Sequence, residues 1–476
     1  MKLTNLLSFA NIIYNFKELI NKVKRKNENA HTLASTGLKI LITGLFTKVG
    51  SVNKMMKGIH NSENNRLKNI FYKREFIPET HAFRDCINDI DYKDVADIHY
   101  QLLNQMKDNK VFENHTYRGS RTMIIDGIEA FETNKDIEGL HIRNHKDGSV
   151  GYYYKSLGMM YLTDDIDIMI DMVPFENVDV KDDKEYNQKI KSEGEITVFK
   201  KIIPQLEEYK IDICVLDCMF LNGPCLNAAK EKNINTIVKM TDTRRELYKD
   251  ASKLFGIQKP KREYEIVEVI VNKKTKYSKK MKKKDTQQSE KYTYTRELTD
   301  VELKKPIVIK EETEETSNKT VIKKTIEKVL KKVKVYADNF EMNNYDYGKV
   351  KVIKVIETIK EKGKIVDKEM YIVTTLLNED LEFIVDLMHR RWDIELKGFR
   401  KLKDRYNIDH LYIGSDNAIR LTMYLAMIVY NLVELYFNVH TRKYKHKINF
   451  ENLFEDYKIE IFITKDFYKY FLLWIL

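Results

Sequence analysis

The sequence predicts an α/β fold in which a mixed sheet carries flanking helices, a β-rich insertion and a helical N-terminal domain. Apolar, β-branched and aromatic runs alternate with helical spacing in the middle of the chain, and a Lys/Glu-rich, strand-like stretch separates them from a final helical part. With 476 residues the chain is long enough for about three domains. Its 43% hydrophobic residues suffice for a large core, and only six prolines and 17 glycines exclude a Pro/Gly-rich disordered chain. Its 33% charged residues exclude an integral membrane protein.

The excess positive charge lies near the N-terminus. The whole chain has 83 Lys and Arg against 72 Asp and Glu, and residues 1–75 hold 14 Lys and Arg against four Glu, a net of +10 out of +11. Such a module favours binding to DNA phosphates, because each neutralised phosphate releases counterions; a solvated basic surface is the alternative. An apolar run at 38–46, a break at 50–51 and a basic segment at 54–57 give a weak helix-turn-helix pattern. We expect residues 1–115 to form a helical, basic DNA-binding region.

Residues 116–254 are expected to form the first part of a central domain with the order β-β-β-α-β-α-β. The corresponding runs lie at 122–131, 151–162, 166–175, 192–209, 211–217, 222–232 and 234–240. Short polar or Gly-containing breaks separate the first three strands, which is typical of an antiparallel meander. Ser192 and Glu195 have the spacing of a capping box and predict the start of the crossover helix, although Glu193 and Glu195 are also candidates for an additional site carboxylate.

Residues 255–367 alternate Lys and Glu with Val, Ile and Tyr and predict a β-rich insertion. Eight of the twelve residues at 273–284 are lysine, which indicates a basic loop that either contacts nucleic acid or is solvated. A further strand and then helical periodicity place the second part of the central domain at 368–440. Residues 441–476 remain as a C-terminal segment.

One apolar stretch, residues 418–437, raises the question of a membrane span. Arg420, Asn431 and Glu434 lie within it and favour a buried core helix. Four cysteines in so long a chain cannot form a disulfide scaffold, and the N-terminus lacks the residue order of a signal peptide. We therefore expect a cytoplasmic protein with no membrane partner.

Two aspartates interrupt apolar strand faces. Asp126 shares its face with Ile124 and Ile128, because side chains alternate along a strand. Asp217 ends the fourth strand after isoleucine and valine residues on its own face. Each is alternatively a strand-end cap or a paired acid. The predicted order places both strands in one contiguous sheet.

A third carboxylate, Glu395, lies on a predicted helix. A rotation of about 100° per residue places it between Arg391 and Phe399, with Trp392 and Lys403 on one flank. Glu395 is therefore either part of an i,i+4 ion pair on a core helix or a metal ligand beside phosphate-binding cations and a stacking ring. Two Asp and one Glu suit two Mg²⁺ ions, because hard cations prefer oxygen ligands. Two such ions activate the attacking oxygen and neutralise the leaving oxygen in a displacement at phosphorus.

The element order and the three carboxylates resemble a known family. The order followed by a helix is similar to the RNase H-like fold, and Asp126, Asp217 and Glu395 resemble the catalytic triad of DDE transposases from bacterial insertion sequences. The segment RRWDIELKGFRKLK is similar to their Tyr, Arg, Glu, Lys signature, and IIDGIEAFE and VLDCMFLNGPCLNAAKEKNINTIVKM resemble the segments around their two aspartates. An insertion before the glutamate-bearing helix also occurs in that group.

The resemblance covers about residues 70–437 and implies a DNA transposase that cleaves element ends and transfers strands into target DNA. It implies that the three carboxylates are catalytic and bind two Mg²⁺ ions, for which Mn²⁺ could substitute. It also implies that Arg391 and Lys403 contact DNA-end phosphates, that Trp392 stacks near the terminal nucleotide, and that a homodimer binds double-stranded DNA of the element ends and target in the nucleoid. The alternatives are a related nuclease without strand transfer and a non-catalytic DNA-binding protein derived from a transposase.

Two positions depart from the signature. Met388 occupies the place of the tyrosine, so that its phosphate contact is either missing or supplied by His389. Lys403 follows Glu395 by eight residues, whereas the signature has seven.

Overall fold

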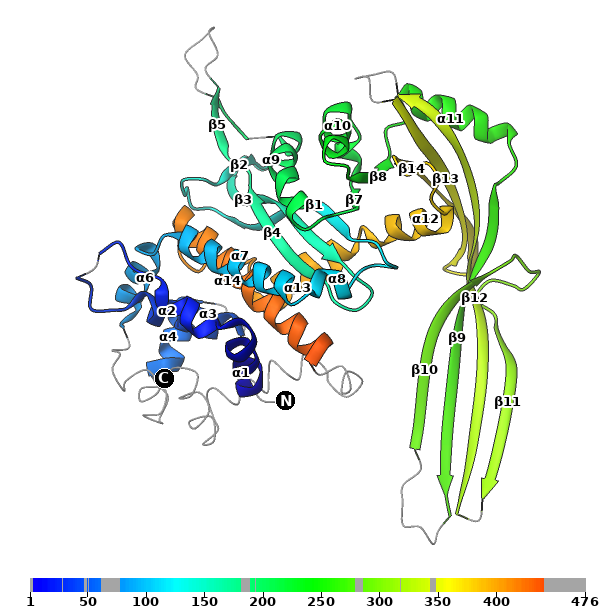
Figure 1. Ribbon diagram of the computed structural model, residues 1–476, viewed down its shortest axis with the longest axis horizontal. Coiled ribbons are helices and arrows are strands. Elements are labelled where there is room, and N and C mark those ends of the chain that lie inside the picture. The colour runs from blue at the N-terminus through cyan, green and yellow to red at the C-terminus, as the bar shows by residue number, and fades with distance from the viewer. Residues whose placement is uncertain are drawn as a thin grey trace. The chain divides into compact units, whose positions relative to one another are not determined.

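The computed structural model describes residues 3–27, 29–46, 49, 51–60, 78–180, 189–192, 194–278, 286–316, 318–342 and 348–440 (Figure 1). Within these ranges the chain forms two compact units. Of the described residues, the first unit comprises those up to residue 220 together with 227–234 and 390–440, and the second comprises 221–226 and those from 235 to 389. The predicted loop lysines between 279 and 284 and the C-terminal segment 441–476 lie outside the described residues.

The N-terminal part of the first unit is helical. Its helices are α1 (Leu3–Tyr14), α2 (Phe16–Lys22), α3 (Ala34–Phe46), α4 (Val52–His60), α6 (Thr80–Asn88), α7 (Tyr92–Asp108) and α8 (Val111–Asn114). In α4, Val52, Met55 and Met56 are buried, whereas Lys54 and Lys57 are exposed. The apolar face therefore attaches this helix to the unit and leaves its lysines at the surface.

The first unit also contains the predicted meander. Its strands are β1 (Thr122–Thr133), β3 (Val150–Leu162) and β4 (Ile168–Pro174), and the short strand β2 (His141–Asn144) pairs with β3 as well. Strand β1 pairs antiparallel with β3 and parallel with β7 (Ile213–Leu216). The resulting order is β7-β1-β3-β2, with β4 also on β3. This mixed sheet confirms the predicted α/β, RNase H-like fold.

The crossover helix α9 (Glu195–Glu208) lies on one side of these strands, and α7 and α14 (Asp416–Leu435) lie on the other (Figure 1). The N-cap of α9 is Gly194 and makes no side-chain cap, so the predicted capping box is wrong. The carboxylate of Glu195 instead forms an ion pair with Lys155 on β3. Strands β5 (Asn177–Val180) and β6 (Lys189–Ser192) form a separate two-stranded sheet.

Helix α14 settles the question of the apolar stretch. The stretch Asp416–Asn438 is long and apolar enough to cross a membrane, but its apolar window is entirely buried within the structure. Arg420 pairs there with Asp416, and Glu434 pairs with Lys401. The prediction of a buried core helix is confirmed.

The second unit is rich in antiparallel strands. They are β8 (Asn235–Met240), β9 (Arg262–Tyr277), β10 (Thr286–Arg296), β11 (Pro306–Thr316), β12 (Lys319–Met342), β13 (Gly348–Glu361) and β14 (Lys364–Thr374), in the order β10-β9-β12-β13-β14-β8 with β11 on β12. Helices α11 (Glu246–Ile257) and α12 (Leu381–Arg390) accompany them. Side-chain alternation explains one face of these strands: Val267 on β9 pairs with Val329 on β12 and both face a small core with Leu303, while the next pair, Glu268 and Lys328, points to the opposite face.

Candidate functional site

Asp126 lies in the middle of the sheet of the first unit. Ile124 and Ile128, two residues to either side of it on β1, are almost completely buried, so the carboxylate emerges from an apolar strand face. Asp126 is opposite Gly158 on β3. Gly158 is needed there, because an added Cβ atom would lie 2.4 Å from Cε1 of the Phe399 ring.

Asp217 comes next to Asp126 by strand register. Strands β1 and β7 run parallel, and their last paired residues are Ile125 and Leu216. Asp126 and Asp217 each follow those residues by one position. Because neighbouring strands lie about 4.8 Å apart, the register brings two acidic side chains to the same place at the end of β7.

Glu395 lies on a π-helix, Ile394–Phe399, between α12 and α13 (Arg400–Tyr406). The N–H of Arg400 donates to the carbonyl oxygen of Glu395, five residues back, which is the π-helical pattern. Gly398 lets this turn approach the sheet, since an added Cβ would lie 3.1 Å from Met169 Sδ and 3.3 Å from Met160 Sδ. The predicted continuous α-helix is therefore interrupted at the candidate site.

The three predicted carboxylates converge on the guanidinium of Arg391. Its Nη1 atom lies 2.5 Å from Asp126 Oδ2, 3.7 Å from Glu395 Oε1 and 3.9 Å from Asp217 Oδ1. The Arg391 side chain is only 5% exposed, whereas the Glu395 side chain is 38% exposed. The carboxylates therefore line the open side of a buried cation.

The pKa of Asp126 reflects both its burial and the repulsion between the carboxylates of this cluster. Burial raises the pKa of Asp126 to about 6; the positive charge of Arg391 opposes that rise, while the negative charges of Asp217 and Glu395 add to it. Arg391 also lies over the ring of Trp392, with 4.7 Å between its Cζ atom and the ring centroid. Trp392 is half exposed.

Lys403 lies near the strand that carries Asp126. Its Nζ atom donates to the carbonyl oxygen of Glu129, three residues further along β1, at 2.6 Å. A π-turn holds one more residue than an α-turn, so eight residues across it cover the same number of turns as seven on an unbroken α-helix. The π-helix at Glu395 therefore compensates for the extra residue before Lys403.

The donor chemistry of this cluster fits hard divalent cations. In the part of the chain that the structure describes, no group of three Asp, Glu, His or Cys residues is placed to hold a metal ion. The three carboxylates nevertheless lie within 4 Å of one nitrogen atom, and that nitrogen belongs to a cation. Three oxygen donors around one positive charge are the ligand set that Mg²⁺ accepts when waters and phosphate complete its shell.

Glu195 and His389 make contacts that sequence alone does not predict. Glu195 comes close to the site strand, because its Oε1 atom lies 3.5 Å from the position of a Cβ added at Gly127, and it pairs with Lys155 at 3.1 Å. His389, the candidate substitute for the missing tyrosine, forms an ion pair of 3.0 Å with Glu357 of the second unit. Met388 is buried.

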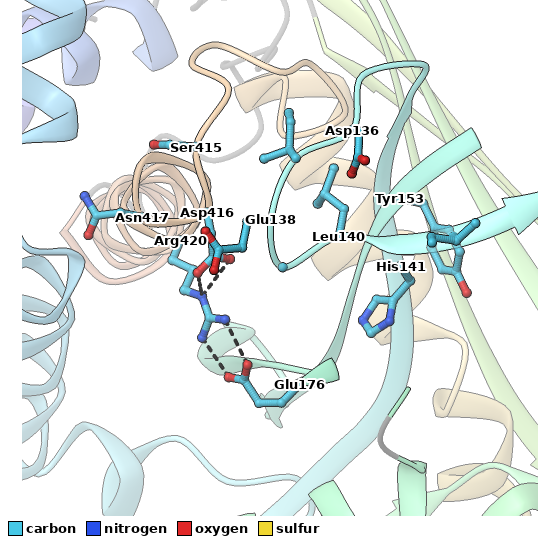
Figure 2. Close-up of a pocket in the computed structure, with 13 residues that line it drawn as sticks. Asp136, Glu138, Leu140, His141, Tyr153, Glu176, Ser415, Asp416, Asn417 and Arg420 are labelled. Atoms are coloured by element: carbon cyan, nitrogen blue, oxygen red, sulfur yellow. Dashed lines mark hydrogen bonds and ion pairs between the residues drawn. The ribbon is translucent and has the colours of Figure 1, made fainter. Parts of the chain in front are cut away.

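A separate pocket of about 810 Å³ lies in the first unit (Figure 2). Its lining includes Asp136, Glu138, Glu176 and Asp416, and Arg420 forms ion pairs with the last two. Figure 2 shows that Arg420 bridges these two carboxylates from α14. The lining does not include the predicted site residues, so the pocket is distinct from the carboxylate cluster.

Comparison with known proteins identifies a family. A family model described as "Transposase DDE domain" matches residues 187–432, which is more than half of the chain. The matched segment includes Asp217 and Glu395 and begins after Asp126. No curated protein matches the chain.

Proposed function

Because this chain belongs to the transposase DDE domain family, we propose that it is a DNA transposase that nicks DNA at the ends of its element and joins the freed 3′-OH to target DNA. The observation that carries the proposal is the convergence of three carboxylates, from β1, the end of β7 and the π-helix, on one buried guanidinium. Burial and mutual repulsion make such a cluster costly for folding alone. Clusters of this kind are characteristic of functional sites.

Asp126, Asp217 and Glu395 are the proposed catalytic residues and metal ligands, for two Mg²⁺ ions or Mn²⁺ in their place. When bound, these ions supply activation of the attacking oxygen and neutralisation of the leaving oxygen. The protein holds the two aspartates on adjacent parallel strands and the glutamate on a turn fixed to the same sheet. Rigid elements of this kind preserve the spacing of ligands during the reaction.

Arg391, Trp392 and Lys403 are the proposed contacts to the DNA end. The Arg391 guanidinium matches the geometry of phosphate oxygens, and the exposed Trp392 ring is suited to stacking on a base. Lys403 is half-buried and close to β1, and its position across the π-turn accounts for its unusual spacing. The departure at Lys403 therefore does not count against a phosphate contact.

The proposal also assigns a role to each part of the chain and names the partners. Residues 1–115 would bind DNA, residues 116–254 and 368–440 would form the catalytic core, residues 255–367 would form an insertion, and residues 441–476 would form a C-terminal segment. Double-stranded DNA of the element ends and of the target would be the partner, and a homodimer would hold the two ends together. The protein would act in the nucleoid.

Incubation of the purified protein with its own flanking DNA and Mg²⁺ tests this function. We expect nicks at the element ends, followed by products joined to a target duplex, and no products when the metal is removed with a chelator. Nicking without joined products would instead indicate a nuclease. Specific binding of the ends without nicking would indicate a non-catalytic DNA-binding protein.

The basic N-terminal region makes a second prediction. Replacing the exposed Lys54 and Lys57 of α4 by Gln should weaken DNA binding and lower the slope of log K against log salt by about 0.9 for each lost phosphate contact. Titrations at several salt concentrations measure this slope. Gln at the exposed Lys135 and Lys146 removes the same charge elsewhere on the unit and serves as the control. An equal change in both pairs would mean that only net charge matters.

A further inference from the structure

Arg391 occupies the centre of the proposed metal site. Its Nη1 atom lies within 4 Å of an oxygen atom of each proposed ligand, and the side chain is 5% exposed. The family resemblance implies a DNA-phosphate contact for this residue, yet in the structure its charge is matched by the protein's own carboxylates. The metal-free protein therefore contains an internal counterion.

This counterion competes with a divalent cation for the same oxygen atoms. Asp126 Oδ2 is committed to the closest contact with Arg391, and a metal ion bound there would bring two positive charges against the guanidinium. Like charges at that distance repel strongly in a partly buried site. Metal binding and the present position of Arg391 are thus mutually opposed.

When a metal ion displaces the Arg391 guanidinium from the carboxylates, the contact with Trp392 limits how far it moves. The exposed neighbour Trp392 holds the guanidinium over its ring. A guanidinium that loses its carboxylates keeps its charge at any ordinary pH, and the planar fork pairs readily with phosphate oxygens. A DNA end that brings a phosphate to this cluster would replace the partner that the metal removes.

We propose, on the basis of the function proposed above, that Arg391 exchanges the three carboxylates for a DNA-end phosphate when divalent cations bind. In this exchange Arg391 is a positioning residue whose carboxylate contacts hold the site closed to metal until DNA is present. The coupling between the divalent cation and the DNA end is reciprocal. The metal therefore raises the affinity for the DNA end by the same factor by which the DNA end raises the affinity for the metal.

The test uses Ca²⁺ as the probe, and the full chain with or without a duplex that carries the element end. Calorimetry measures the affinity for Ca²⁺. In the wild type we expect the duplex to tighten Ca²⁺ binding by about tenfold or more. In Arg391→Gln we expect the DNA-free protein to bind Ca²⁺ about tenfold more tightly than the wild type, and the coupling factor to shrink. Arg400→Gln removes one charge from an exposed position on α13 and should leave both quantities unchanged.

A second measurement does not depend on the folding of an Arg391 variant. The chain has two tryptophans, so Trp474→Phe leaves Trp392 as the sole reporter. Saturation with Ca²⁺ should change the Trp392 emission, because the guanidinium over its ring loses its carboxylate partners and shifts. NaCl of equal ionic strength should leave the emission unchanged.

Two failures are distinguishable. Ca²⁺ binding that is equal or weaker in a folded Arg391→Gln protein, or Trp392 emission that is unchanged at saturation, would overturn the exchange and leave the metal assignment intact. A wild type that binds no Ca²⁺ with or without DNA would overturn the proposed metal site itself, and the exchange with it.

Discussion

Replacing any one of the three carboxylates, by Asp126→Asn, Asp217→Asn or Glu395→Gln, is expected to lower Mg²⁺-dependent nicking and joining by roughly a thousandfold or more. Metal ions contribute several kcal/mol to such displacements, and about 1.4 kcal/mol corresponds to a tenfold change in rate. Each substitution removes one charge and nearly preserves shape. Nicking of an end-labelled duplex measures the activity, and the thermal unfolding midpoint of the same preparations measures the stability.

Stability separates this result from a structural ion pair. Asp126, Asp217 and Glu395 repel one another, so neutralising one of them relieves repulsion while the others still balance Arg391. We therefore expect folding and DNA binding to survive. Asp404→Asn, at an exposed acid that pairs with Arg400 on the next helix, provides a matched control with full activity. Wild-type activity in one of the three variants would remove that residue from the site, and unfolding with loss of activity would favour the ion pair.

The positions of the two aspartates could be predicted because they depend on strand geometry. Period-two alternation identifies Asp126 as an acid on an apolar face, and the parallel pairing that comes after a crossover helix brings Asp217 beside it. The buried helix at 416–438 was also predictable, since three polar residues in an apolar run argue against lipid. These features depend on short-range periodicity and on the order of elements.

The remaining details depend on interactions that periodicity does not encode. The π-turn arises where Gly398 and Phe399 fit against the sheet, so an assumption of 100° per residue misplaces the residues beyond Glu395. The start of α9 at Gly194 leaves Glu195 to pair with Lys155 on a strand distant in sequence. Helical spacing places Arg391 beside Glu395, but the burial of Arg391 among all three carboxylates depends on tertiary packing.

Asn431 on α14 supports the edge of the site sheet. Strand β4 pairs with β3 on one side, and Asn431 reaches the backbone of Met169 on β4. Its Oδ1 atom accepts from the Met169 N–H at 2.9 Å, and its Nδ2 group donates to the Met169 carbonyl at 2.8 Å. Asn431 is completely buried, so it supplies the pairing that a further strand would give.

Replacing Asn431 by Leu is expected to lower the free energy of unfolding of the first unit by about 2–6 kcal/mol, because a buried donor and a buried acceptor each lose their partner at about 1–3 kcal/mol. Thermal unfolding followed by circular dichroism measures the loss. Met427→Leu, at another fully buried position of α14, changes shape without removing a hydrogen bond and should cost less than about 1.5 kcal/mol. Since Met169 also packs beneath Gly398 on the π-helix, the variant should reduce nicking as well. Equal midpoints for the two variants would show that packing volume at α14, rather than the amide pairing with β4, holds this edge of the sheet.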